Sequence, residues 1–197
     1  MGTMPLLIVT WPYGLLFWAV FVWAFAPEFR IVSRRAEPSA TAQDAGSKRL
    51  IMVGQGVGMA AAFTIAQRVP SATLPHRVWL LWAGVAAMVG GSLLRRHCWR
   101  MLGASFTGAV IVRIDQVVVE RGAYRYVRHP SYTAGALLFF GIGLALANGI
   151  SLLLLMVTVV SVYGYRVIVE ERALETTIGD PYRSYIRRTK RFVPFMF

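Results

Sequence analysis

Residues 131–165 read SYTAGALLFFGIGLALANGISLLLLMVTVVSVYGY, a stretch without a charged side chain. At about 1.5 Å per residue, a helix of this length would exceed one crossing of a hydrocarbon core about 30 Å thick. Asn148-Gly149 stands near the middle and is typical of a tight turn. The stretch therefore predicts a helical hairpin with arms at residues 132–147 and 150–166, the second continuing beyond Arg166 into the headgroup region.

Three further uncharged runs precede the hairpin, at residues 5–26, 50–67 and 78–94. The first is too long for the apolar part of a signal peptide, and no basic residue precedes it. In the second, Gly54, Gly58 and Ala62 recur every four residues, which lets a neighbouring helix approach closely. With 56% hydrophobic residues, the chain is predicted to be an all-α, polytopic membrane protein with about five transmembrane helices. Residues 1–197 are expected to form one integral membrane domain.

The basic residues predict the orientation of these spans. Nineteen of the 21 Lys and Arg residues fall in the loops after the first and third spans or at the C-terminal end; Arg68 and Arg77 lie opposite. Cytoplasmic loops are rich in Lys and Arg, so the N-terminus is predicted outside and the C-terminus in the cytoplasm, in a multi-pass protein of a bacterial inner membrane. The formal charge of +12 thus indicates orientation, and no nucleic-acid partner is expected. Arg95 and Arg96, which end the third run, are expected to snorkel to the membrane interface.

Other features exclude some functions. The single Cys98 rules out an intramolecular disulfide, and the scattered positions of His76, His97 and His129 give no metal-site spacing, so no metal is expected. Residues 33–48 (SRRAEPSATAQDAGSK) are small, polar and of mixed charge, which predicts a flexible surface loop.

Two polar clusters flank the hairpin, so its antiparallel arms would place both on the same side of the membrane. The first, GAYRYVRHPSY (122–132), puts His129 and the following proline at the start of a helix, where the positive helix end attracts anions. The second, RVIVEERAL (166–174), puts Arg166 and Glu170 on one helical face. Interfacial anchors and a modest ion pair are the alternative interpretations. Together the clusters predict one shared pocket.

A short helix is predicted after Gly179-Asp180-Pro181, which resembles a helix stop, an N-cap and a first-turn proline. Its aromatic residues, Tyr182 and Tyr185, stand among basic ones. This pattern predicts an amphipathic helix on anionic headgroups, with a lid over the pocket as the alternative.

In this order and spacing, the clusters resemble the isoprenylcysteine carboxyl methyltransferase family and its bacterial relatives, which are membrane-embedded and use S-adenosylmethionine. The resemblance rests on Gly-x-Tyr-x-x-x-Arg-His-Pro-Ser-Tyr, the hairpin, Arg-x-x-x-Glu-Glu-x-x-Leu and Gly-x-x-Tyr-x-x-Tyr, and covers about residues 94–197. It implies a cytoplasmic-side cofactor pocket formed by the last hairpin, the preceding loop and the C-terminal helices.

The resemblance also implies roles for single residues. The positions that would contact the cofactor are Gln116, Val117, Val118, Val119, Tyr124, His129, Pro130, Ser131, Tyr132 and Glu170. Arg166 matches the arginine that relatives place at the substrate, and Arg166 with Glu170 would form the catalytic pair. Two positions depart from the family pattern: Gln116 replaces a frequent histidine and Ala123 a frequent proline, which leaves the acceptor open.

The chemistry suits these residue types. His129 with the helix N-terminus could hold the cofactor carboxylate, Glu170 its ammonium, and Tyr124 or Tyr132 its ring. Transfer to a carboxylate consumes two opposite charges and is favoured in a dry pocket, where Arg166 would orient the acceptor. We therefore expect carboxyl O-methylation of an isoprenylcysteine-like or other lipid-like acid, either a small molecule or lipid-anchored, among membrane lipids.

Three alternatives remain at this point. A phospholipid or amine N-methyltransferase would need a base such as Glu170, Glu171 or a tyrosine. An NADPH-dependent membrane reductase would need a nicotinamide cofactor. A non-enzymatic membrane protein or transporter is disfavoured because the spans hold no charged residue before Arg166. The sequence leaves the oligomeric state open.

Overall fold

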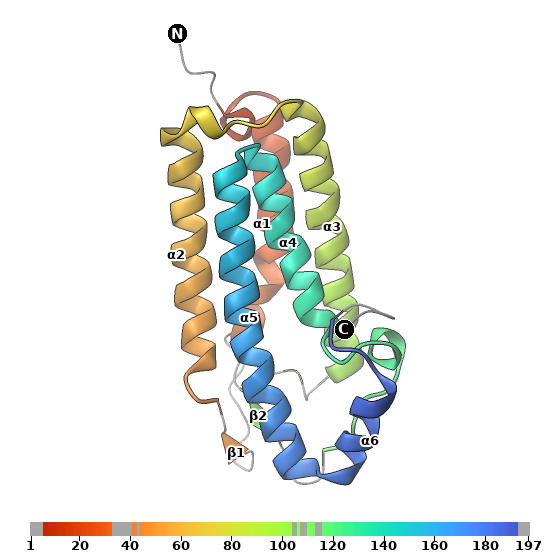
Figure 1. The fold of residues 1–197 in the computed structure, drawn as a ribbon. Coiled ribbons are helices and arrows are strands. Elements are labelled where there is room, and N and C mark those ends of the chain that lie inside the picture. Colours follow the sequence, from red (N-terminus) through yellow and green to blue (C-terminus); the bar gives the residue numbers. More distant parts are fainter. Residues whose placement is uncertain are drawn as a thin grey trace.

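The structure is a computed structural model that describes residues 6–32, 41–42, 44–103, 106, 110–112 and 116–192. Five long helices form an upright bundle (Figure 1): α1 (Tyr13–Val32), α2 (Ser47–Arg68), α3 (Arg77–Leu102), α4 (Pro130–Leu146) and α5 (Gly149–Ile178). The shorter elements are α6 (Asp180–Arg188) and the 3-10 turns η1 (Leu7–Val9), η2 (Pro70–Ala72) and η4 (Gly122–Arg125). Two short strands, β1 (Thr41–Ala42) and β2 (Ile111–Val112), pair antiparallel below the bundle, with Thr41 opposite Val112.

The helices match the predicted runs except at two ends: α1 begins at Tyr13 rather than at residue 5, because η1 and a turn precede it, and α4 ends one residue before the predicted 147. α2, α3 and α5 are each long and apolar enough to cross a membrane, whereas α4 and the apolar part of α1, Tyr13–Glu28, are shorter. The prediction of an all-α, polytopic membrane fold is confirmed. The 30 residues of α5 span about 45 Å, so its end extends beyond the hydrocarbon core, as predicted.

Small residues let the helices approach closely at two contacts. A methyl group added at Gly58 on α2 would lie 2.8 Å from Thr158 on α5, which confirms the predicted role of this stripe. The contact between α3 and α4 is tighter: a Cβ at Gly84 would lie 2.4 Å from the carbonyl oxygen of Gly141. The backbones of α3 and α4 therefore touch, which fixes α4 above the site it helps to build.

The turn between α4 and α5 is built as the sequence predicts. Ala147 adopts a left-handed conformation (φ 49°), and the side chain of Asn148 caps α5 by accepting a hydrogen bond from the amide of Ser151 (3.1 Å). The same side chain donates to the carbonyl of Val69 (2.9 Å). The turn is thereby tied to the α2–α3 connection at the upper end of the bundle, and the two polar clusters meet at the lower end (Figure 1).

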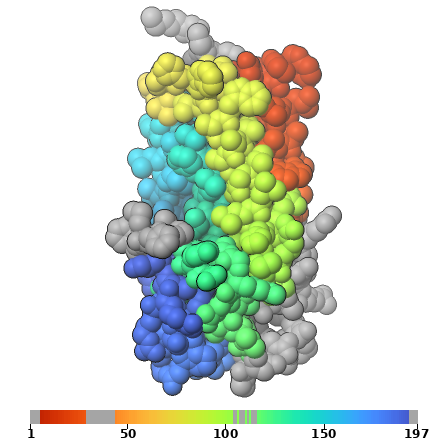
Figure 2. Space-filling view, turned by 90° about the vertical axis from the view of Figure 1, so that its right-hand side faces the viewer, coloured from red at the N-terminus to blue at the C-terminus, as the bar shows by residue number. Residues whose placement is uncertain are grey.

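The short helix α6 turns its aromatic face toward the protein. Tyr182 and Tyr185 are buried, and the Tyr185 hydroxyl donates to the carbonyl of Tyr124 (2.6 Å). Figure 2 shows the α6 end of the chain beside the segment around η4 at the lower end of the molecule. The two tyrosines pack against the protein's own pocket, which agrees with the alternative of a lid, and the placement of the basic face of this helix on headgroups stays a prediction. Gly179 (φ 74°), rather than Asp180, is the residue that precedes the helix.

Candidate active site at the lower end of the bundle

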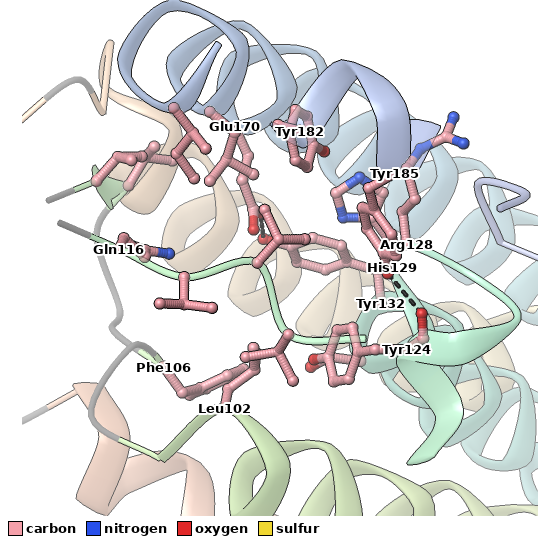
Figure 3. Close-up of a pocket in the computed structure, with 18 of the residues that line it drawn as sticks. Leu102, Phe106, Gln116, Tyr124, Arg128, His129, Tyr132, Glu170, Tyr182 and Tyr185 are labelled. Atoms are coloured by element: carbon pink, nitrogen blue, oxygen red, sulfur yellow. Dashed lines mark hydrogen bonds between the residues drawn. The ribbon is translucent and has the colours of Figure 1, made fainter. Parts of the chain in front are cut away.

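A pocket opens where α3 and α5 end and α4 begins (Figure 3). Its volume is about 900 Å³ when the open mouth is included. Pro130 is buried in the first turn of α4 and does not line the pocket. Every other predicted site residue does: Gln116, Val117, Val118, Val119, Tyr124, His129, Ser131, Tyr132, Arg166 and Glu170.

One part of the pocket lining is apolar. Leu102 and Phe106 come from the end of α3 and the residues after it, and Leu174 and Ile178 come from the last turns of α5. The segment 116–119 adds three consecutive valines and passes along the pocket in Figure 3. Apolar lining of this kind suits a flat ring or a hydrocarbon group.

Tyr132 joins the two residues that were predicted as the catalytic pair. Its hydroxyl donates to a carboxylate oxygen of Glu170 (2.6 Å) and accepts from Nε of Arg166 (3.1 Å). Figure 3 shows the Glu170 carboxylate directed toward the Tyr132 ring. Arg166 is only 4% exposed, so its charge acts in a poorly solvated place. An anion and a cation are thus held side by side on the pocket wall.

Asp44 is a site residue that sequence reasoning missed. Arg166 Nη1 donates to a carboxylate oxygen of Asp44 and to the hydroxyl of Ser47 (2.6 Å). Asp44 also accepts hydrogen bonds from the backbone amides of Lys48 (2.9 Å) and Val110 (2.9 Å), and so caps the start of α2. Asp44 lies two residues before Gly46, the N-cap of α2, so the usual capping pattern would not have indicated it, nor its contact with a distant arginine.

These contacts correct the prediction of a flexible loop in part. Residues 33–40 and 43 lie outside the described residues, but Asp44 is fixed by three separate segments. Burial alone would raise the pKa of Asp44, but the hydrogen bonds from the Lys48 and Val110 amides and the charge of Arg166 outweigh it and lower the pKa. Asp44 is therefore an anion at neutral pH.

Glu171, the neighbour of Glu170, holds the other side of the pocket together. Its carboxylate lies 3.1 Å from Nε2 of His129 and accepts hydrogen bonds from Nε of Arg128 (3.1 Å) and Nη2 of Arg191 (2.6 Å). The prediction named Glu171 only as a possible base. In the structure its surroundings are three basic side chains from two distant segments.

The segment after α6 lies alongside the first polar cluster and is hydrogen-bonded to it. The amide of Arg128 donates to the carbonyl of Lys190 (2.8 Å), and the amide of His129 donates to the carbonyl of Arg191 (3.0 Å). The Thr133 hydroxyl donates to the carbonyl of Phe192 (2.8 Å). With the Arg191–Glu171 ion pair, these bonds hold the segment after α6 beside the start of α4.

Arg95 does not snorkel as predicted. Its side chain is 12% exposed and pairs with Glu28 of α1, while Nη1 donates to both the carbonyl (2.8 Å) and the hydroxyl (3.0 Å) of Ser131. Its guanidinium also lies over the Trp99 ring. Partners on α1 and α4 draw the side chain inward, so Arg95 fixes the first turn of α4 from behind the pocket.

Tyr124 completes the wall next to η4. It is buried, and burial raises the pKa of its hydroxyl far above the ordinary value. Tyr124 therefore remains a neutral phenol, able to donate a hydrogen bond but not to act as a base at neutral pH.

Comparison with known proteins agrees with the resemblance seen in the sequence. Residues 83–176 match the model of the isoprenylcysteine carboxyl methyltransferase (ICMT) family. This part of the chain is therefore similar to that family. The match runs from α3 through most of α5 and includes both polar clusters of the pocket, but leaves out Glu28, Asp44 and α6.

Individual proteins that are similar to this chain have names that correspond to this family. The chain is 30% identical over 125 residues to protein-S-isoprenylcysteine O-methyltransferase B of Arabidopsis thaliana, covering 62% of this chain and 64% of that protein. It is 31% identical over 108 residues to the protein-S-isoprenylcysteine O-methyltransferase of Schizosaccharomyces pombe, covering 54% of this chain and 46% of that protein. The matches thus span less than two thirds of these ICMT relatives.

A solved structure shows the same fold. The eukaryotic intramembrane Ras methyltransferase ICMT superposes with a TM-score of 0.68 at 19% sequence identity, over 96% of this chain and 70% of that chain. The likeness therefore includes α1, α2 and α6, which the ICMT family match does not reach.

Proposed function

We propose that this chain transfers a methyl group from S-adenosylmethionine to the carboxylate of an isoprenylcysteine-like, lipophilic acid, free or lipid-anchored, at the cytoplasmic face of a bacterial inner membrane. The observation that supports it best is the hydrogen-bonded series Glu170–Tyr132–Arg166, which places an anion and a cation in one pocket. The ICMT family match covers all three residues. The concentration of basic residues at the pocket end supports a cytoplasmic orientation for that end.

The residues present fit the cofactor, which when bound supplies a methyl group on a positively charged sulfur. Glu170 offers a carboxylate for its ammonium group, and Tyr124 or Tyr132, which stand in a lining rich in apolar side chains, are proposed to face its adenine ring. The hydroxyl of Tyr182, a pocket-lining residue, is buried without a hydrogen-bond partner among the described residues, so this wall still has a polar group to satisfy.

His129 is proposed to face the carboxylate end of the cofactor. It is 4% exposed and is held at the pocket wall by Glu171 and by the segment after α6. Gln116, the other valines, Pro130 and Ser131 would shape the rest of the binding surface, Pro130 from within α4.

Arg166 is proposed to orient the acceptor carboxylate. Such a group is already ionised at neutral pH, so the chain needs no general base, in keeping with the neutral Tyr124. The low exposure of Arg166 keeps water away from the reacting charges, which strengthens their attraction. The chain's residues thus bind, orient and exclude water.

Calorimetry on the detergent-purified protein tests this proposal. Wild type should bind S-adenosylmethionine and S-adenosylhomocysteine with affinities of about −8 kcal/mol, in the micromolar range. Glu170→Gln should lose most of this affinity, and Glu175→Gln, on the same helix but outside the pocket lining, should keep it. No binding by folded wild type in the presence of lipid would refute the cofactor assignment. A transferred methyl group that resists mild base would refute the ester and favour N-methylation.

A further inference from the structure

We infer that Asp44 is a specificity-determining residue: it offsets the charge of Arg166 and thereby limits how strongly the acceptor end of the pocket holds a carboxylate. This inference rests on the proposed function, because it concerns the acceptor assigned to Arg166. The residue lies outside both the ICMT family match and the polar clusters of the sequence.

The first step is the direct contact between the two side chains. Arg166 Nη1 donates to Asp44, and the Arg166 side chain is 5% exposed whereas that of Asp44 is 20% exposed. Water therefore screens this pair only weakly. The cation proposed to attract the acceptor already has an intramolecular counter-ion.

The second step is the charge of the whole series. Asp44, Arg166, Tyr132 and Glu170 follow one another through hydrogen bonds, with Tyr132 uncharged. Two carboxylates and one guanidinium give this series a net negative charge. An entering carboxylate meets repulsion from Asp44 and Glu170 along with attraction to Arg166, whereas a neutral ligand of the same shape meets neither.

The third step is that Asp44 stays in place without Arg166. Its carboxylate accepts from the Ser47 hydroxyl (3.0 Å) and from the amides of Lys48 and Val110, all from the start of α2 or the residue before β2. An asparagine at this position keeps one oxygen, which can still accept from Ser47 and Val110, whereas the amide of Lys48, which uses the second oxygen, loses its partner. Asp44→Asn therefore changes the charge while keeping most of the geometry.

The experiment compares two probes that differ in one charge: N-acetyl-S-farnesylcysteine, which has a free carboxylate, and its carboxamide. Binding to the purified protein is measured by calorimetry without cofactor. Asp44→Asn should increase the affinity for the carboxylate probe by about tenfold or more, and should change the affinity for the carboxamide probe by no more than about twofold. Ser47→Ala, which removes an uncharged partner of Arg166, should leave the ratio of the two affinities unchanged.

Asp180→Asn is the matched charge control, because Asp180 is an exposed acid on α6 that pairs with Arg183 away from the pocket. It should leave both affinities unchanged. An unaltered ratio of the carboxylate and carboxamide affinities in Asp44→Asn, or a loss of carboxylate binding in this variant while it still binds the carboxamide, would overturn the inference. Equal tightening in Asp180→Asn would also overturn it. Failure of S-adenosylmethionine to bind is a separate result that bears on the proposed function alone.

Discussion

The hydroxyl of Tyr132 donates to Glu170 across the hairpin, at a distance of 2.6 Å, and so links the first turn of α4 to α5. Tyr132→Phe removes this bond and leaves a carboxylate and a guanidinium each short of one partner. We expect cofactor binding to weaken by about 1–3 kcal/mol in calorimetry. Tyr126→Phe, which alters an exposed tyrosine in the same cluster, should bind normally. Equal affinities for both variants would show that the bond does not position Glu170.

Substitutions of Arg166 and of Glu170 should affect different quantities, turnover and cofactor affinity respectively. Arg166→Ala is expected to keep much of the S-adenosylmethionine affinity and to lose turnover, because the guanidinium is assigned to the acceptor. Arg166→Lys should rescue little, since one ammonium cannot replace the fork that reaches Tyr132, Asp44 and Ser47. Calorimetry and a methyl-transfer assay on the same samples check this. Loss of S-adenosylmethionine binding in Arg166→Ala, with binding retained in Glu170→Gln, would reverse the assigned roles.

Glu171→Gln should loosen the C-terminal segment. The change leaves Arg128, His129 and Arg191 without their shared anion. Removing one partner from a buried ionic cluster lowers the free energy of unfolding by about 3–5 kcal/mol. The loss should be smaller here because the Arg191 side chain is 47% exposed. Limited trypsin digestion should cut the basic residues after α6 faster than in wild type. Glu175→Gln is the control, and unchanged cleavage in Glu171→Gln would argue against an anchoring role.

Asp44 should make part of the stability depend on pH. Because its pKa is lowered in the folded protein, its contribution is fully present above the ordinary aspartate pKa of about 3.9 and is lost as pH falls through the lowered value. The difference in thermal stability between wild type and Asp44→Asn should therefore shrink toward acid pH below about 4. A difference that stays constant from neutral to acid pH would show that the Asp44 charge does not stabilise the fold.

The proposed orientation predicts the side of the membrane on which each end of the chain lies. A protease-sensitive tag fused after residue 197 should be protected in sealed, right-side-out vesicles and cut in inverted ones. A tag before residue 1 should show the opposite pattern. Digestion of the C-terminal tag in right-side-out vesicles would overturn the cytoplasmic placement of the pocket.

Local patterns were enough to predict the hairpin and the meeting of the two polar clusters in one pocket. The uncharged run, the Asn148 turn and the position of Pro130 each depend on nearby residues, and the antiparallel arms then bring the two polar clusters together. The family resemblance added Gln116 and the valines, which no periodicity would have indicated.

The partners of the buried charges could not be predicted in the same way. Glu170 and Glu171 are neighbours, but about 100° of helix rotation separates their side chains, so one meets Tyr132 and the other meets His129. The rotation of α5 about its axis relative to α4 decides which of the two glutamates contacts Tyr132 and which contacts His129. Arg95 and Arg166 likewise depend on acids far away in the sequence, and an apolar run does not reveal which acid will reach its arginine.

Two of the buried arginines take their acids from outside the family segment: Arg95 pairs with Glu28 and Arg166 with Asp44. The family segment is therefore not an interchangeable module. A chimera that joined residues 83–176 to the first two helices of a relative would strand two cations unless matching acids came with those helices. Among relatives, we expect each arginine and its acid to change together. An alignment should therefore show covariation between positions 28 and 95 and between positions 44 and 166.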